Sequence, residues 1–160
     1  ATILYNGPVL EHGFNHPYQL SDKLLIAYTK ARTNQSVLCD FPRDAINMTH
    51  TVENGDIVLL FTDGVLDNLF PKDVEMAVRK WQESDSKHNT TALAVGLTEL
   101  AVRVSQAPNA HTPFQERAEA DGLACQGGKS DDIGVVAARV VQTEPAAEPS
   151  NPPDEDRGLE

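Results

Sequence analysis

Hydrophobic residues form short continuous runs in two parts of the chain and recur at helical spacing between them. Residues 57–61 read Ile-Val-Leu-Leu-Phe, with the length and composition of a strand buried on both faces. A second apolar run over residues 133–141 predicts the strand that closes the fold. Asn54-Gly55, just before the first run, is a tight-turn dipeptide.

Three helices are predicted between these strands. One begins at Pro71, since proline suits the first helical position, and ends before the polar break at residues 84–87. A second is capped by Asn89 and continues to Gln106, with a leucine-rich stripe facing the core. A short third helix runs from Pro113 to about Ala120. Strands followed by helices and a final strand favour an α+β fold.

Before residue 54 the hydrophobic pattern predicts secondary structure less clearly than it does after that residue. Residues 2–5 are β-prone and precede a turn at residues 6–8, so they resemble part of a hairpin leading to a strand that ends near Phe14. Residues 24–29 suit either a helical turn or a strand, and the strand is favoured. Residues 46–52 alternate and predict a half-exposed strand that Asn54-Gly55 joins to residues 57–61 as a hairpin. His12 and His16 are four apart, which on a helix would suggest metal ligands, but Gly13, Asn15 and Pro17 disfavour a helix, so we expect them to be structural or surface residues.

Composition narrows the function classes. The 160 residues allow one modest domain over residues 1–142, and the Pro- and acid-rich residues 143–160 predict a disordered tail. A formal net charge of −11 argues against binding nucleic acid or anionic membranes. No apolar run reaches the roughly 18 residues of a membrane span. Neither a signal peptide nor a transit peptide is visible, and two cysteines predict free thiols in a reducing, intracellular compartment.

Carboxylates lie where both predicted strands end. Thr62-Asp63-Gly64 follows the first strand directly, with Asp67 four residues after Asp63. Gly128-Lys129-Ser130-Asp131-Asp132 leads into the last strand. If these strands are neighbours, Asp63 and Asp131 can share one hard divalent cation. Either stretch alone could equally be an acidic surface turn.

Together the two stretches resemble the PP2C (PPM-type) phosphatases. Residues 62–67 (T-D-G-V-L-D) are similar to that family's T/S-D-G-x-x-D motif. Residues 128–133 (G-K-S-D-D-I) are similar to its G-x-x-D-N/D-I/M motif. Residues 12–20 and 113–118 narrow the similarity to the PTC7-like branch. The resemblance extends over roughly residues 11–141 and rests on four motifs in one order.

The resemblance implies a fold and an activity. The fold is an antiparallel β-sandwich flanked by antiparallel helices, and the activity is metal-dependent hydrolysis of phosphorylated serine and threonine in proteins by a binuclear Mg²⁺ or Mn²⁺ centre. By resemblance, Asp63 and Asp131 ligate one ion and Asp67 helps to hold a weaker third ion. Asp132, Gly64 and Thr62 support these ligands, and Lys129 is interpreted as a solvated loop lysine. No side chain is assigned as a nucleophile, and family resemblance suggests a mitochondrial location.

The chain resembles the C-terminal half of such a domain. The family's early Asp-Gly metal motif has no counterpart in it, so an N-terminal half-domain would have to come from elsewhere. A non-catalytic, truncated PP2C-like binding module is therefore the alternative. A haloacid-dehalogenase-like phosphatase is disfavoured, because Phe61 stands where that class has its nucleophilic aspartate.

Overall fold

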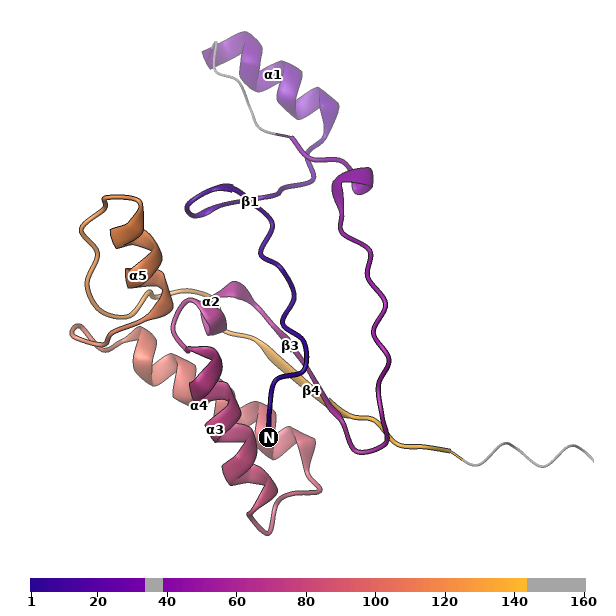
Figure 1. Cartoon of the computed structure of the whole chain (residues 1–160). Coiled ribbons are helices and arrows are strands. Elements are labelled where there is room, and N and C mark those ends of the chain that lie inside the picture. Colours follow the sequence, from indigo (N-terminus) through magenta and orange to yellow (C-terminus); the bar gives the residue numbers. More distant parts are fainter. Residues whose placement is uncertain (34–38, 144–160) are drawn as a thin grey trace, which may run out of the picture.

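The computed structural model describes residues 1–33 and 39–143 as an α+β arrangement, as predicted (Figure 1). Strand β3 (Ile57–Phe61) pairs antiparallel with β4 (Val135–Arg139). In this register Ile57 lies opposite Arg139, and Phe61 lies opposite Val135. The end of β3 and the start of β4 therefore meet at one end of the ribbon, although more than seventy residues separate them along the chain.

Helices α3 (Pro71–Gln82) and α4 (Thr90–Ser105) lie together on one face of this ribbon (Figure 1). Their apolar stripes and the short helix α2 (Asp63–Leu66) with the turn after it supply the buried core. Its members are Val65, Leu69, Val74, Val78, Trp81, Leu93, Leu97 and Ala101. The indole Nε1 of Trp81 donates to the Asn89 carbonyl at 3.0 Å, which ties the end of α3 to the start of α4.

The three predicted helices are confirmed, and their starts follow from local chemistry. The Asp73 carboxylate accepts from the Phe70 N–H at 2.9 Å at the start of α3. The Asn89 side chain accepts from the Ala92 N–H at 3.1 Å at the start of α4. Thr112 does the same for α5 (Pro113–Ala120), accepting from the Gln115 N–H at 3.2 Å.

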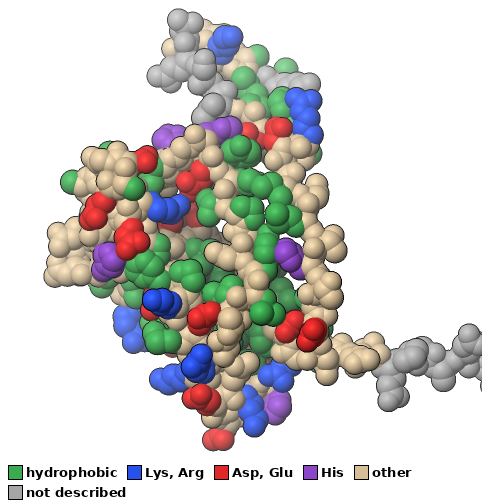
Figure 2. All heavy atoms as spheres, in the orientation of Figure 1, with side chains coloured by type: hydrophobic (Ala, Val, Ile, Leu, Met, Phe, Trp, Pro, Cys, Tyr) green, Lys and Arg blue, Asp and Glu red, His purple; other side chains and the backbone are tan. Residues whose placement is uncertain are grey.

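The outer face of the β3–β4 ribbon is exposed, so the prediction that β3 is buried on both faces is wrong. Val58, Leu60 and Val136 are 40%, 63% and 59% exposed, whereas Ile57, Leu59 and Phe61 pack against the helices. Within residues 1–33 and 39–143 no second sheet is stacked on this face. Figure 2 shows further hydrophobic side chains gathered over the middle of one side of the molecule.

The predicted hairpin between residues 46–52 and β3 does not form. Residues 46–52 have no regular structure, and Ile46, Met48 and Val52 are about half exposed. Among the described residues β3 pairs with β4 alone, and Ile57, Leu59 and Phe61 pack against the helical core. The turn at Asn54-Gly55 is present, with Gly55 at φ 99°, and it extends the β3–β4 ladder through a bond from the Gly55 N–H to the Val140 carbonyl.

The strand predicted over residues 24–29 is also wrong, because these residues belong to helix α1 (Lys23–Thr33). The Asp22 carboxylate accepts from the Leu24 N–H at 2.7 Å and caps the first turn, and good helix formers such as Lys30, Ala31 and Arg32 extend it. Residues 2–5 form no strand either. Two short strands, β1 (Glu11–Gly13) and β2 (His16–Pro17), pair around a turn at Phe14, and a 3₁₀ turn covers Pro42–Asp44.

His12 has the structural role that was predicted for it. Its Nε2 lies 2.8 and 3.0 Å from the two carboxylate oxygens of Asp40, and its ring stacks on Tyr18. The Gln19 N–H also donates to Asp40 at 2.7 Å. Burial raises the pKa of the Asp40 carboxyl, but the hydrogen bonds from His12 and Gln19 outweigh that effect and hold it below its ordinary value. This network links His12 of β1 to Asp40, which lies just before the 3₁₀ turn.

The predicted tail falls on residues 143–160, of which only Thr143 lies in the described part of the chain. Both Cys39 and Cys125 are free thiols, as predicted. Among the described residues, no helix is both long and apolar enough to cross a membrane.

The lowered pKa of Asp40 predicts an acid-sensitive N-terminal region. The folded carboxylate binds a proton less readily than the unfolded one, so its stabilisation is present above the ordinary carboxyl pKa and is lost as pH falls through the lowered value. Melting temperatures measured from pH 6 to pH 2.5 should fall more steeply for the wild-type chain than for Asp40→Asn. Parallel curves for the two proteins would contradict this role of Asp40.

Gly128 should be intolerant of any side chain. A Cβ there would lie 2.0 Å from the Val104 carbonyl oxygen, in the backbone at the end of α4. We expect Gly128→Ala to lower the free energy of unfolding by at least about 2 kcal/mol in urea titrations. Gly96→Ala is the control, because that glycine is exposed within α4 with open space around it. It should raise stability by about 0.5–1 kcal/mol.

Candidate metal centre

Two of the carboxylates come from a single turn after β3. Thr62 follows the strand as the N-cap of α2, which begins at Asp63. Asp67 is the C-cap of this helix, and its N–H donates to the Asp63 carbonyl at 2.8 Å. Residues four apart on a helix lie on the same face, so both carboxylates project from one side of this turn. The turn is anchored to the core by the side chain of Val65, which is fully buried.

The antiparallel pairing brings the third carboxylate alongside. The Thr62 hydroxyl donates to the Asp132 carbonyl and accepts from the Gly134 N–H, each at 2.8 Å. A Cβ on Gly64 would lie 2.6 Å from the same Asp132 carbonyl oxygen and 3.1 Å from the Asp131 Cβ. Only glycine at position 64 therefore lets the two backbones approach this closely.

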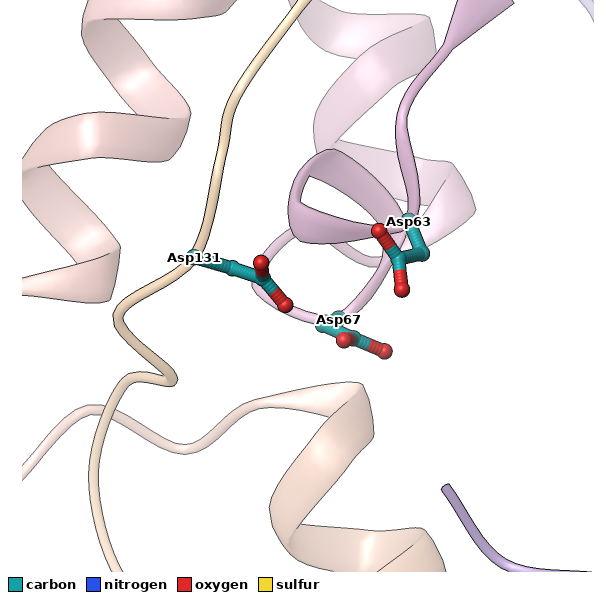
Figure 3. A group of neighbouring side chains, drawn as sticks. All are labelled: Asp63, Asp67 and Asp131. Carbon is teal, nitrogen blue, oxygen red and sulfur yellow. The ribbon is translucent and has the colours of Figure 1, made fainter. Parts of the chain in front are cut away.

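Asp63, Asp67 and Asp131 form one cluster, with an oxygen from each within 4.8 Å of the others. In Figure 3 the carboxylates of Asp63 and Asp131 approach from opposite sides, with Asp67 between them. Asp67 is buried, while the other two are exposed. Three carboxylates with hard oxygen donors at this spacing fit a divalent cation such as Mg²⁺ or Mn²⁺.

Asn68, which was not predicted as a site residue, holds the two halves of the cluster together. Its side chain is almost fully buried, at 1% exposure. The amide nitrogen donates to the carbonyls of Gly64 and Lys129 at 2.8 and 2.9 Å, and the amide oxygen accepts from the Lys129 N–H at 2.9 Å. This one side chain therefore fixes α2 against the loop that carries Asp131.

Lys129 is not the solvated loop lysine that was expected. Its ammonium donates to Asp67 at 2.6 Å and contacts Asp131 at 2.8 Å, and its side chain is only 18% exposed. Burial tends to lower the pKa of Lys129, but the two carboxylates outweigh this and raise it. The hydrogen bond from Lys129 in turn lowers the pKa of the Asp131 carboxyl.

Arg117 is a second cation that pattern reasoning did not assign to the site. It projects from α5, inside the segment 113–118 that helped to define the resemblance, and its guanidinium contacts both Asp67 and Glu11 of β1. Asp67 is thus paired with two cations. For Asp63 the described residues include no cationic partner, only the Gly64 N–H at 3.0 Å.

Of the other predicted site residues, Thr62 acts through its hydroxyl and Gly64 through its lack of a side chain, while Asp132 acts through its backbone. The Asp132 N–H donates to Asp131 at 2.8 Å, and its carbonyl accepts from Thr62. Phe61 packs against the core instead of contributing to the cluster, which agrees with its exclusion as a nucleophile position.

The chain is similar to known protein phosphatases in sequence and in fold. No family model matches the chain. A Drosophila mojavensis protein named protein phosphatase PTC7 homolog fig is 36% identical to it, over 86% of this chain and 45% of that protein. A zebrafish (Danio rerio) PTC7 homolog is 34% identical over 88% of this chain. A Saccharomyces cerevisiae protein named protein phosphatase 2C homolog 7, mitochondrial, is 34% identical over 80% of this chain and 38% of its own length.

The X-ray structure of the photosystem II phosphatase PBCP superimposes on 87% of this chain with a TM-score of 0.70 and 25% identity. The chain belongs to the PTC7-like branch of the PP2C family. PP2C phosphatases depend on metal ions, and the cluster of Asp63, Asp67 and Asp131 supplies suitable donors. The chain spans somewhat less than half of the length of these curated relatives and 52% of the PBCP chain.

Loss of the Asn68 side chain should weaken the attachment of α2 to the loop that carries Asp131, and so destabilise this PP2C-like site. Asn68→Ala leaves a buried N–H and two carbonyls without their partner, and each such group costs about 1–3 kcal/mol. We expect the free energy of unfolding in urea to fall by at least about 2 kcal/mol. Asn109→Ala is the control because Asn109 is exposed and makes one long bond to Gln126. Equal stabilities of the two variants would contradict the role of Asn68.

Proposed function

We propose that this chain carries one part of the active site of a metal-dependent protein serine/threonine phosphatase, which hydrolyses phosphomonoesters of phosphorylated proteins. The observation that supports this most directly is the cluster of three aspartates on the β3–β4 ribbon of a PP2C relative. The relatives are named as protein phosphatases, which supports the reaction class.

In this proposal each aspartate has a distinct task. Asp63 and Asp131 hold one Mg²⁺ or Mn²⁺, because Asp63 has no cationic partner in the described part of the chain and both side chains are exposed. Asp67 contributes less to that ion, since Arg117 and Lys129 already engage both of its oxygens. A binuclear centre supplies an activated water and neutralises the phosphoryl oxygens. Thr62, Gly64 and Asp132 keep the two exposed carboxylates at a fixed separation.

Three carboxylates are too few for two ions. A binuclear centre needs several ligands for each metal, and the cluster found among the described residues contains three carboxylates. We propose that the rest of the ligands come from an N-terminal half-domain, in keeping with the share of the relatives' length that this chain spans. The exposed face of Val58, Leu60 and Val136 suits the packing of a second sheet from that half.

A non-catalytic binding module is the second candidate, and one observation favours it. Lys129 and Arg117 already neutralise much of the charge of the cluster, as they would in a domain that had no further use for metal. The two candidates differ in whether a complementary half restores turnover. A mitochondrial location also belongs to the proposal and is suggested by the name of the yeast relative.

We expect the 160-residue chain alone to show little phosphatase activity, because a two-ion reaction needs both ions at fixed positions. Adding the N-terminal half of a related phosphatase, in trans or by fusion, should give Mn²⁺-dependent hydrolysis of an aryl phosphate and of a phosphopeptide. Asp63→Asn should then reduce kcat/KM on the order of a thousandfold. Asp85→Asn, which changes an exposed aspartate after α3, should leave it unchanged.

Three results would count against this proposal. Strong turnover by the chain alone would show that another group replaces the missing ligands. Activity that survives Asp63→Asn would remove the assigned site. A folded complex without any turnover would favour the binding module.

A further inference from the structure

The ammonium group of Lys129 occupies the space between two of the three aspartates. Its Nζ lies 2.6 Å from an Asp67 oxygen, 2.8 Å from an Asp131 oxygen and 3.2 Å from the Asn15 side-chain oxygen. The ring of Phe114 covers it at 4.9 Å. Three oxygens and an aromatic face around a cation that is 18% exposed make a specific position, not a mobile surface side chain.

The backbone of Lys129 is held as firmly as its head group. Both its N–H and its carbonyl bond to the buried Asn68 side chain. The two preceding glycines leave no space for a Cβ, because Gly128 packs against the backbone at the end of α4 and Gly127 packs against the backbone of Ala107 and Pro108 just after that helix. The start of the side chain is therefore fixed, and only its four-carbon stem can move the ammonium away from the cluster.

The charges around the cluster are unevenly shared. Three aspartates face two cations, and both cations contact Asp67, while Lys129 alone reaches Asp131. If Lys129 left Asp131, Asp67 would still keep Arg117 as its partner. Asp131 would then have an oxygen available beside Asp63, which is the pair needed to hold a divalent ion.

We propose that the Lys129 ammonium is a built-in counter-ion that competes with the divalent cation for Asp131, so that metal binding requires it to swing off that carboxylate. This inference rests on the proposed metal centre and concerns its occupancy. A dication bound to Asp63 and Asp131 would lie within a few ångströms of the ammonium, and two cations at that distance in a partly buried site repel strongly. Asn15 and Asp67 remain within reach as acceptors for the displaced ammonium.

The competition has two consequences. Without metal, the cluster stays compact because Lys129 screens the repulsion between Asp67 and Asp131. With metal, part of the binding free energy is used to move Lys129, so the site binds metal more weakly than its donors alone would allow. The lysine thus sets the metal concentration at which the centre fills.

The test is Mn²⁺ binding by the full 160-residue chain, measured by calorimetry for three proteins. Lys129→Gln removes the competing charge, and we expect it to bind Mn²⁺ about tenfold more tightly than the wild type. Lys80→Gln is the matched control, since it makes the same change in net charge on the exposed face of α3. It should change affinity by less than about twofold. Melting curves establish that each variant is folded.

Equal or weaker Mn²⁺ binding by Lys129→Gln would overturn the proposal, because the ammonium would then orient the aspartates instead of competing for them. Equal gains in both variants would also overturn it, since the effect would come from net charge alone. Absence of Mn²⁺ binding in every protein would overturn it as well.

A second measurement covers the case in which Lys129→Gln does not fold. The unchanged chain, labelled with ¹⁵N-lysine, is titrated with Mg²⁺ while the Nζ resonance of Lys129 is followed, assigned by its loss in Lys129→Arg. A shift that saturates with Mg²⁺ supports displacement, and a constant resonance overturns it.

The proposed function and this inference can fail separately. Turnover of the reconstituted enzyme that depends on Asp63, without tighter metal binding by Lys129→Gln, refutes only the competition. Tighter binding by Lys129→Gln in a complex that shows no turnover refutes only the phosphatase.

Discussion

The pairing of β3 with β4 is the constraint on which the rest of the structure depends. Its register places Phe61 opposite Val135 and so brings the residues after β3 next to the residues before β4. A slip by one residue would turn Ile57, Leu59 and Phe61 away from the helices and remove most of the sheet's contribution to the core. The same slip would break the Thr62 contacts that place Asp131 beside Asp63. Folding and site geometry are therefore set by one ladder.

Sequence patterns identified the parts of this chain that are defined locally. The helix starts at Pro71, Asn89 and Pro113 depend on capping within one turn, and a window of a few residues contains the information. The aspartates could also be identified from the sequence, because they follow or precede recognisable strands. Asp63 and Asp67 are four residues apart, a spacing that places two side chains on the same face of a helix. These features need no knowledge of distant contacts.

The failures lie where the deciding partner is far away along the chain. Residues 46–52 alternate like a strand, but alternation cannot tell which distant segment a strand will pair with, and among the described residues β3 pairs with β4 alone. Lys129 and Asn68 are 61 residues apart, and Arg117 reaches Asp67 across 50 residues. A pattern of residue types indicates which side chains could ionise or ligate. It does not indicate which of them the fold brings within bonding distance.

Arg117 has a consequence beyond charge balance. One guanidinium contacts Asp67 in the cluster and Glu11 in β1, and α5, which carries it, is fastened to the loop before β4 by a buried bond from Thr112 to Gly127. Helix α5, the loop before β4 and the β1–β2 ribbon are therefore connected to the acidic cluster through this one side chain. A displacement of β1 that carried Glu11 with it would strain the contact between Arg117 and Asp67, so the geometry of the buried aspartate depends on a residue that lies more than fifty positions before it in the chain.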